Sequence, residues 1–192
     1  TIAPGDAKAV YLDGAGSGAA VVDAFASLSV GALNGITSKT FGTSSIMIGD
    51  NATGTIDAAN FNTGLGVDVF AALTTGDNNV AVGTFALDAN TTANNNTAVG
   101  GYTLTNNSTG ANNTAVGTAA LLTNTTASNN TAVGNDAMRA NTTGSENVAV
   151  GSSTLDANTT GIKNSAFGTA ALGDNTTGDF NTAVGRQALK FN

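Results

Sequence analysis

The feature that most constrains the fold is a 17-residue internal repeat. Each repeat unit contains an Ala-Val-Gly motif, or a close variant, that ends in a glycine, and no insertion interrupts the series. These repeat glycines are Gly83, Gly100, Gly117, Gly134, Gly151, Gly168 and Gly185. The same spacing extends back to Gly66 and Gly49, so the sequence predicts nine coils in one register over residues 45–192. A strict period that is too short for a helical hairpin is typical of a solenoid built from one coil per repeat.

The residues before each repeat glycine predict a short β-strand. Valine, or Phe167 in one copy, comes directly before the glycine, alanine comes two before it, and threonine, valine or serine comes three before it. The residue four before it is asparagine in every copy from Asn79 to Asn181. This alternation has the two-residue period of a strand, with valine on one side and alanine with asparagine on the other. We expect the valines to lie inside the coil and the asparagines to form a ladder of stacked amides rather than a binding surface.

A second apolar column follows four residues after each repeat glycine. Its members are Leu87, Leu104, Leu121, Met138, Leu155, Leu172 and Leu189. We expect this column to lie on a second short strand. The segment Asn-Thr-Thr, or a close variant, comes next and is followed by alanine or glycine, as in residues 124–127 and 141–144. Asn, Thr and Gly together predict a turn, and the alanines indicate that a positive φ is not required at that position.

Together these patterns predict an all-β fold, a parallel β-solenoid or β-roll of about nine 17-residue coils. Each coil contributes only about one valine and one leucine to its interior, worth about 1.5–3 kcal/mol each. Ordering the backbone costs about 1–2 kcal/mol per residue, so a single coil cannot fold alone and even the stack is thin. The unbroken alanine column indicates close approach, either to the opposite wall or to a neighbouring subunit. We therefore predict a homo-oligomer.

The first part of the chain does not follow the repeat. Residues 7–12 and 19–25 read as two strands joined by a glycine-rich loop at 13–18, and residues 26–41 read as a transition. We predict a small N-terminal β-hairpin-like adaptor over residues 1–44 and the repeats over residues 45–192. The last repeat stops at Asn192, the residue that opens the next turn, which leads us to expect that the coils continue in a longer fibrous protein.

Composition excludes several kinds of chemistry. The chain has no Cys and no His, which removes disulfides, thiolate nucleophiles, zinc–thiolate sites and imidazole bases. Its formal net charge is −7, and its six basic residues are scattered, so no basic surface for nucleic acid is predicted. No apolar run approaches the roughly 20 residues of a membrane-spanning helix. We predict a protein that is not an enzyme, binds no cofactor and inserts into no membrane, and we nominate no catalytic, cofactor-binding or metal-binding residue.

Three functions known for repetitive β proteins are disfavoured. An ice-binding array is disfavoured because the paired threonines are adjacent in a turn, and the threonine column three before the glycine is interrupted by Val80, Val148 and Ser165. A calcium ladder needs carboxylates in every coil, whereas the column five after the glycine changes from Asp88 to Leu122. Glycan hydrolysis needs two placed carboxylates, and the chain has a single Glu with Asp residues at variable turn positions.

The strand segment resembles a known repeat. Residues 80–83 and 147–151 resemble the Asn-Ser-Val-Ala-Ile-Gly repeat of trimeric autotransporter adhesin heads. This resemblance implies a left-handed parallel β-roll with three chains side by side, although the repeat of that family is usually shorter. The longer unit, as in residues 130–134 with 140–144, is similar to repeats in phage tail fibres and large bacterial surface proteins. The opening residues 2–14, with 21–24, resemble a segment that precedes shafts in tail fibres, including those of phages infecting marine cyanobacteria.

The sequence and these resemblances lead to a structural hypothesis. We expect a homotrimeric segment of a phage tail fibre, a rigid shaft that acts in the virion outside the host cell. Its expected partners are its sister chains, other virion tail proteins, and a host-surface glycan or protein receptor. The alternative is the head of a bacterial trimeric surface adhesin whose β-roll itself binds matrix or glycan at the cell surface. A third hypothesis is a carbohydrate-degrading spike with an active site between subunits.

Overall fold

The computed structural model describes residues 38–39, 46–48 and 59–191. All described residues belong to one unit of the chain, residues 38–192. The predicted hairpin at residues 7–25 and the rest of the predicted adaptor up to residue 37 therefore lie outside the described residues. The first of the nine predicted coils also lies partly outside them.

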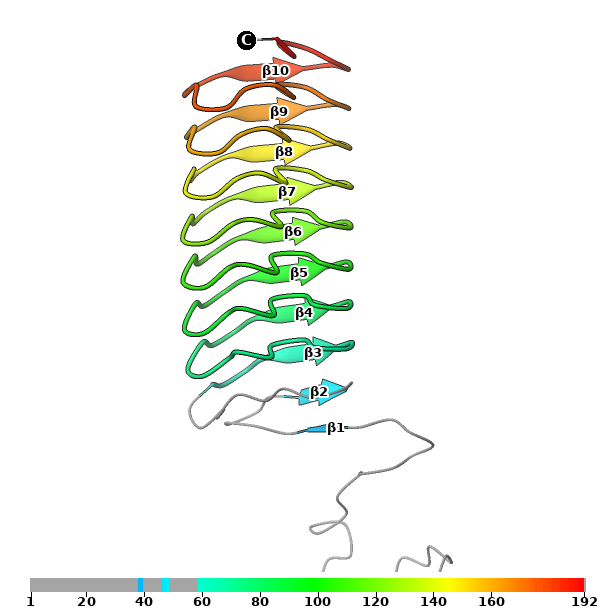
Figure 1. The fold of residues 1–192 in the computed structure, drawn as a ribbon, viewed down its shortest axis with the longest axis vertical. Helices are drawn as coiled ribbons and strands as arrows, with labels where there is room; N and C mark the ends of the chain where they lie inside the picture. The colour runs from blue at the N-terminus through cyan, green and yellow to red at the C-terminus, as the bar shows by residue number, and fades with distance from the viewer. Residues whose placement is uncertain (1–37, 40–45, 49–58, 192) are drawn as a thin grey trace, which may run out of the picture. The chain divides into compact units, whose positions relative to one another are not determined.

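The described strands form one ten-stranded sheet in which the strands follow chain order. β1 (Ser38–Lys39) pairs antiparallel with β2 (Ile46–Ile48), and every later pair is parallel. The remaining strands are β3 (Thr63–Leu65), β4 (Val80–Val82), β5 (Thr97–Val99), β6 (Thr114–Val116), β7 (Thr131–Val133), β8 (Val148–Val150), β9 (Ser165–Phe167) and β10 (Thr182–Val184). Each parallel pair is offset by one repeat, as in Ala98↔Ala115. The strands therefore stack like rungs (Figure 1).

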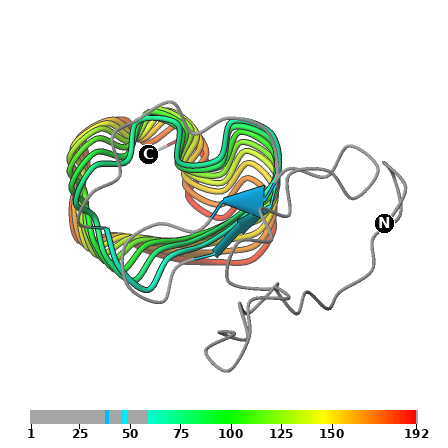
Figure 2. The same cartoon turned by 90° about the horizontal axis from the view of Figure 1, so that it is seen from below.

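The architecture is a parallel β-solenoid with one 17-residue coil per repeat, as the sequence predicted. Residues 59–191 make seven complete coils, and the residues that the structure describes contain no helix. Viewed along the stack, successive coils superpose on a common outline (Figure 2). The period of the sequence is thus the circumference of one coil.

The strand faces the opposite way from the one predicted. In strands β3 to β10 the central residue, alanine in all but Gly64 of β3, is buried, whereas the residue before the repeat glycine, usually valine, is half-buried or exposed and points outward. The prediction that valine fills the interior is therefore wrong. The coil is too narrow for a second large side chain opposite the leucine column, and only a methyl group fits at the strand. The alanine column does mark a close approach, to the opposite wall of the same coil.

The core is one thin column of apolar side chains. The leucine column is fully buried from Phe70 to Leu172, together with the strand alanines and the small residues that precede each leucine. Leu189, in the last described coil, is 49% exposed because no described coil covers it. The burial predicted for the leucine column is thus confirmed, apart from this terminal member.

The wall that carries the leucine column is not the strand that the sequence predicted. Residues two and four after each repeat glycine, such as Tyr102 and Leu104, have φ values between about 48° and 59°. The segment is therefore a run of turns rather than extended chain. It still bonds from coil to coil, because Leu104 N–H donates to Ala120 O at 3.1 Å and Tyr102 N–H donates to Thr84 O at 2.8 Å. The residue two after the glycine thus donates to the coil before, and the residue four after it donates to the coil after.

The repeat glycine is required by both backbone conformation and space. Gly117 has φ of +126°, and a Cβ placed on it would lie 2.5 Å from Gly134 O in the next coil. A side chain at this corner would therefore be strained and would separate the coils. The glycines of the Asn-Thr-Thr turn, by contrast, have no positive φ, which agrees with the alanines at positions 93 and 127.

Candidate functional surface

Two ladders of buried asparagines hold the coils in register. In the strand ladder, Asn113 N–H donates to Asn96 Oδ1 at 2.9 Å, and Asn113 Nδ2 donates to Ala127 O at 2.9 Å. In the turn ladder, Asn124 Nδ2 donates to Asn107 Oδ1 at 2.8 Å and to Ala127 O at 3.0 Å. No buried side-chain polar atom of the described residues lacks a partner. The predicted asparagine ladder is confirmed, and it is part of the core rather than a surface for ligands.

The two threonines of each turn have different roles. The first donates its hydroxyl to the next coil, as Thr125 Oγ1 does to Thr142 O at 3.1 Å. The second is exposed, and its hydroxyl makes no hydrogen bond within the described residues; this column is Thr75, Thr92, Thr109, Thr126, Thr143, Thr160 and Thr177. The paired threonines therefore present a single file of free hydroxyls, not a flat two-column array.

One outer face of the solenoid carries no charge. This strand face consists of the first and third residues of strands β3 to β10, which point outward: Thr63, Leu65, Val80, Val82, Thr97, Val99, Thr114, Val116, Thr131, Val133, Val148, Val150, Ser165, Phe167, Thr182 and Val184. Leu65, Phe167 and Val184 are the most exposed apolar members. The face is therefore an uncharged strip made mostly of valine and threonine.

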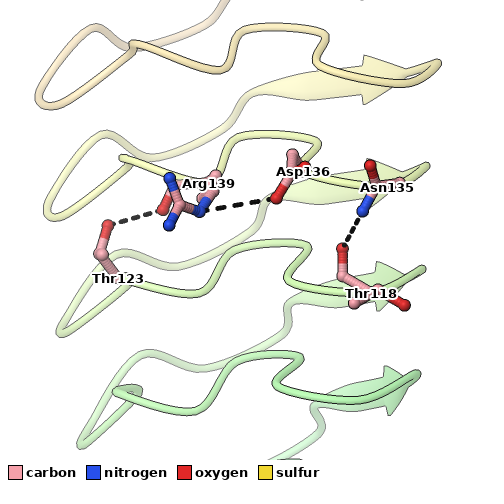
Figure 3. A network of polar contacts seen from close by, with 5 residues as sticks. All are labelled: Thr118, Thr123, Asn135, Asp136 and Arg139. Atoms are coloured by element: carbon pink, nitrogen blue, oxygen red, sulfur yellow. Dashed lines mark hydrogen bonds and ion pairs between the residues drawn. The ribbon is translucent and has the colours of Figure 1, made fainter.

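The charges lie elsewhere on each coil. The loop face consists of the residues one, two, five and six positions after each repeat glycine, and it carries most of the charged side chains. The other charges of residues 59–191 lie on the turn before the strand; Glu146, the single Glu, is exposed there. The only ion pair among the described residues joins Arg139 Nε to Asp136 Oδ1 at 3.5 Å (Figure 3). It is exposed, so it contributes little to stability.

Hydrogen bonds from side chains to backbone carbonyls link neighbouring coils on the loop face. Thr123 Oγ1 donates to Arg139 O at 2.7 Å, and Asn135 Nδ2 donates to Thr118 O at 3.2 Å (Figure 3). Each of these bonds joins one coil to the next. The loop face thus combines varied side chains with the regular spacing of the stack.

Two carboxyl groups of the loop face have perturbed acidity. Burial raises the pKa of Asp88 above its usual value, and the negative charge of Asp68 raises it further. Burial also raises the pKa of Asp156, as do Asp136 and Asp174, while Arg139 opposes them. Both residues lie in the column five after the repeat glycine.

The described residues contain no group of three potential ligands that could hold a metal ion. None of their segments forms a helix able to cross a membrane.

Sequence reasoning missed one feature of the loop face. Phe85 and Tyr102, one repeat apart, stack with ring centroids 5.3 Å apart and an interplanar angle of 28°. Reading the column two after the repeat glycine would have placed them side by side.

Comparison with protein-family models, curated proteins and solved structures found no match to this chain. Functional inference therefore rests on the solenoid and its surfaces.

Proposed function

We propose that this chain is a structural fibre segment, a rigid homotrimeric shaft in the tail of a phage. The observation that carries the proposal is the uncharged strand face, which runs along every described coil from β3 to β10. A face of half-exposed valines is costly to leave in water, because each buried methylene is worth about 0.8 kcal/mol. Packing against sister chains would remove it from water.

Charge favours a second copy of the chain as the occupant of this face. Each copy has a formal net charge of −7, so charged surfaces of two copies would repel each other. The strand face is the part of the coil on which like copies can meet without that repulsion. Its threonine hydroxyls and valine methyls repeat once per coil, which suits an in-register partner with the same period.

The strand face alone is smaller than the surface that each partner buries in a stable complex. Eight strands at about 4.8 Å and three residues at about 3.3 Å make a strip of about 400 Å². A stable complex buries about 800 Å² on each partner. We therefore expect the residue rows beside the strip to be covered too, as three chains around one axis would do.

The proposed role is mechanical. The two asparagine ladders and the coil-to-coil backbone bonds tie each coil to both neighbours, so the stack resists bending and local unfolding. In this proposal residues 1–44 are an adaptor to other virion tail proteins, nine coils form the shaft, and a host-surface glycan or protein is the eventual receptor. The strand, the turn and the leucine column supply the rod, and no catalytic residue is invoked.

Sedimentation of charge variants tests the trimer. We expect the wild-type chain to sediment with three times the mass of a single chain, and Val116→Lys with Val133→Lys to shift it to monomer. The matched control is Thr126→Lys with Thr143→Lys, which adds the same charge on the exposed turn and should remain trimeric. A wild-type monomer at micromolar concentration, or a trimeric strand-face variant, would contradict the proposal.

The bacterial adhesin head is the second candidate, and the varied side chains of the loop face favour it. A surface that differs from coil to coil suits recognition better than spacing. An antibody raised against the chain separates the two candidates by electron microscopy. Label on virion tails supports the shaft, whereas label on bacterial cell surfaces supports the adhesin.

A further inference from the structure

The aromatic pair Phe85–Tyr102 is not explained by packing or by backbone preference. Tyr102 is 49% exposed, and its hydroxyl makes no hydrogen bond within the described residues. Both residues have left-handed φ values, 58° and 59°, a region that strains a bulky side chain. The same column holds Asp68, Ala119 and residues of other types elsewhere, so the fold does not require aromatic rings there.

The surroundings of the pair leave the rings accessible. In the next coil the column continues with Ala119, whose methyl group is too small to stack on the Tyr102 ring. Beside the ring, Gly101 has no heavy atom within 4 Å of the place where a Cβ would lie. That position is filled by threonine, serine, asparagine or arginine in the other described coils from Thr84 onward. The absence of a side chain at Gly101 is therefore not forced by crowding, and it leaves open space next to Tyr102.

Two other exposed rings of this solenoid each have a cationic partner, which the Phe85–Tyr102 pair lacks. The ammonium group of Lys163 lies 5.4 Å from the centroid of Phe180, and that of Lys190 lies 5.0 Å from the centroid of Phe191. These distances are within the range of cation–π attraction. Residues 59–138 contain no Lys or Arg, and no cation–π contact involves Phe85 or Tyr102 among the described residues.

Two carboxylates lie on the Phe85 side of the pair instead. Asp68 occupies the same column one coil before Phe85, and Asp88 lies three residues after Phe85 on the same coil. Neither forms an ion pair within the described residues. The two carboxylates interact with each other unfavourably, since the charge of Asp68 raises the pKa of Asp88. By the repeat register both carboxylates lie within one coil of Phe85, so a positive charge on that side of the pair would be attracted by both.

We propose that Phe85, Tyr102, Asp68 and Asp88 form a binding site for a small organic ammonium ion, which lies against the aromatic pair on the side of the two carboxylates. The face of an aromatic ring is electronegative and attracts cations, and quaternary ammonium groups suit such sites because they are weakly hydrated. The two carboxylates supply the charge complement. The site goes beyond the shaft function and does not depend on it.

Choline chloride is the probe, and Tyr102 itself is the reporter. The chain has two tyrosines, Tyr11 and Tyr102, so ring-labelled tyrosine gives two NMR signals of which Tyr11 is the internal reference. At pH 7.5 and constant ionic strength, we expect a saturable shift of the Tyr102 signal alone, half-complete at about 1–10 mM choline. The neutral carbon analogue 3,3-dimethyl-1-butanol has the same shape and should bind at least ten-fold more weakly.

Variants test the two parts of the site separately. Asp68→Asn with Asp88→Asn should weaken choline binding at least five-fold while leaving the rings in place, and Phe85→Leu should weaken it at least three-fold. Phe180→Leu, which removes an exposed ring outside the site, should change nothing. Equal binding of the neutral analogue, no saturable shift up to 100 mM choline, or an unchanged midpoint in the double asparagine variant would each overturn the proposal. The asparagine variant is isosteric and keeps the test valid if Phe85→Leu does not fold.

Discussion

The side-chain amide of Asn124 donates a hydrogen bond of 2.8 Å to the side-chain oxygen of Asn107, one coil earlier, and both residues are fully buried. The bond joins identical positions of successive repeats. Because the same Nδ2 also donates to Ala127 O at 3.0 Å, each amide stabilises its own turn and the neighbouring coil together. Register between coils is thus fixed inside the molecule, not at its surface.

Removing one amide from this ladder should be costly. Asn124→Ala leaves Asn107 Oδ1 and Ala127 O without this donor, and a buried unsatisfied polar group costs about 1–3 kcal/mol. We expect a loss of about 2–4 kcal/mol in the free energy of unfolding, measured with urea. Asn106→Ala removes an exposed amide from the coil before it and should change stability by less than about 0.5 kcal/mol. Equal effects of the two substitutions would show that the ladder does not stabilise the fold.

The leucine column provides a second matched pair. Leu121 is fully buried and Leu122, the next residue, is half-buried on the loop face. Leu121→Ala should destabilise the protein by about 2–5 kcal/mol, because it removes apolar contacts and leaves a cavity. Leu122→Ala should cost less than half as much in the same thermal or urea unfolding experiment. If the order were reversed, the assignment of inside and outside on this wall would be wrong.

Two glycines separate backbone strain from side-chain volume. Gly117→Ala places a methyl group against Gly134 O at a φ of +126°, and we expect a loss of at least about 3 kcal/mol. Gly101→Ala enters open space without a positive φ, so it should be neutral or stabilise by up to about 1 kcal/mol, through the lower entropy of the unfolded chain. Differential scanning calorimetry of the two variants decides the matter. Similar melting temperatures of the two variants would show that the positive φ and the close contact at Gly117 do not determine the loss of stability.

Acidification should stabilise the solenoid. The pKa values of Asp88 and Asp156 in the folded protein are raised above the ordinary value of 3.8. Between the ordinary and the raised pKa values the folded protein binds more protons than the unfolded chain, so stability increases as the pH falls through this window and decreases as it rises. We expect the melting temperature to rise as the pH is lowered from 7 toward 4.

A double variant isolates these two groups from the general effect of net charge. Asp88→Asn with Asp156→Asn should be more stable than the wild type at pH 7 and should show a flatter dependence of the melting temperature on pH. Asp77→Asn with Asp179→Asn, on the turn before the strand, makes the same change in charge and serves as the control. A wild-type slope in the first variant would mean that burial of these carboxyl groups does not affect folding.

The period carried most of what could be predicted about the fold. Identical spacing between repeats forces identical residues to stack, so the asparagine ladder and the burial of the leucine column followed from the sequence without knowledge of the coil's outline. The sidedness of the strand did not follow. Alternation shows which residues share a side, and the choice between Ala115 inside and Val116 inside depends on the width of the coil, which no single repeat reveals.

The wall that carries the leucine column was predicted as a strand because its residue types do not indicate the positive φ values found there. Positive φ is usually marked by glycine or asparagine, yet here it occurs at Leu104, Leu121 and their equivalents. Nothing in a leucine indicates a left-handed conformation, so tertiary packing and coil-to-coil hydrogen bonds override local preference. The aromatic pair was missed for a different reason. Phe85 and Tyr102 are separated by one full repeat in the chain, and their proximity appears only when the variable columns are read as carefully as the constant ones.

The positive-φ corner at each repeat glycine has a consequence for how molecules of this type change in size. Because the described coils meet their neighbours through the same backbone bonds and asparagine ladders, deleting or duplicating a 17-residue unit among them leaves the cross-section and these contacts unchanged. Recombination between repeats can therefore change the length of the solenoid in steps of about 4.8 Å. An insertion or deletion of a single residue, by contrast, would put a side chain where Gly117 now stands. The number of repeats that the gene encodes therefore sets the length of such a molecule.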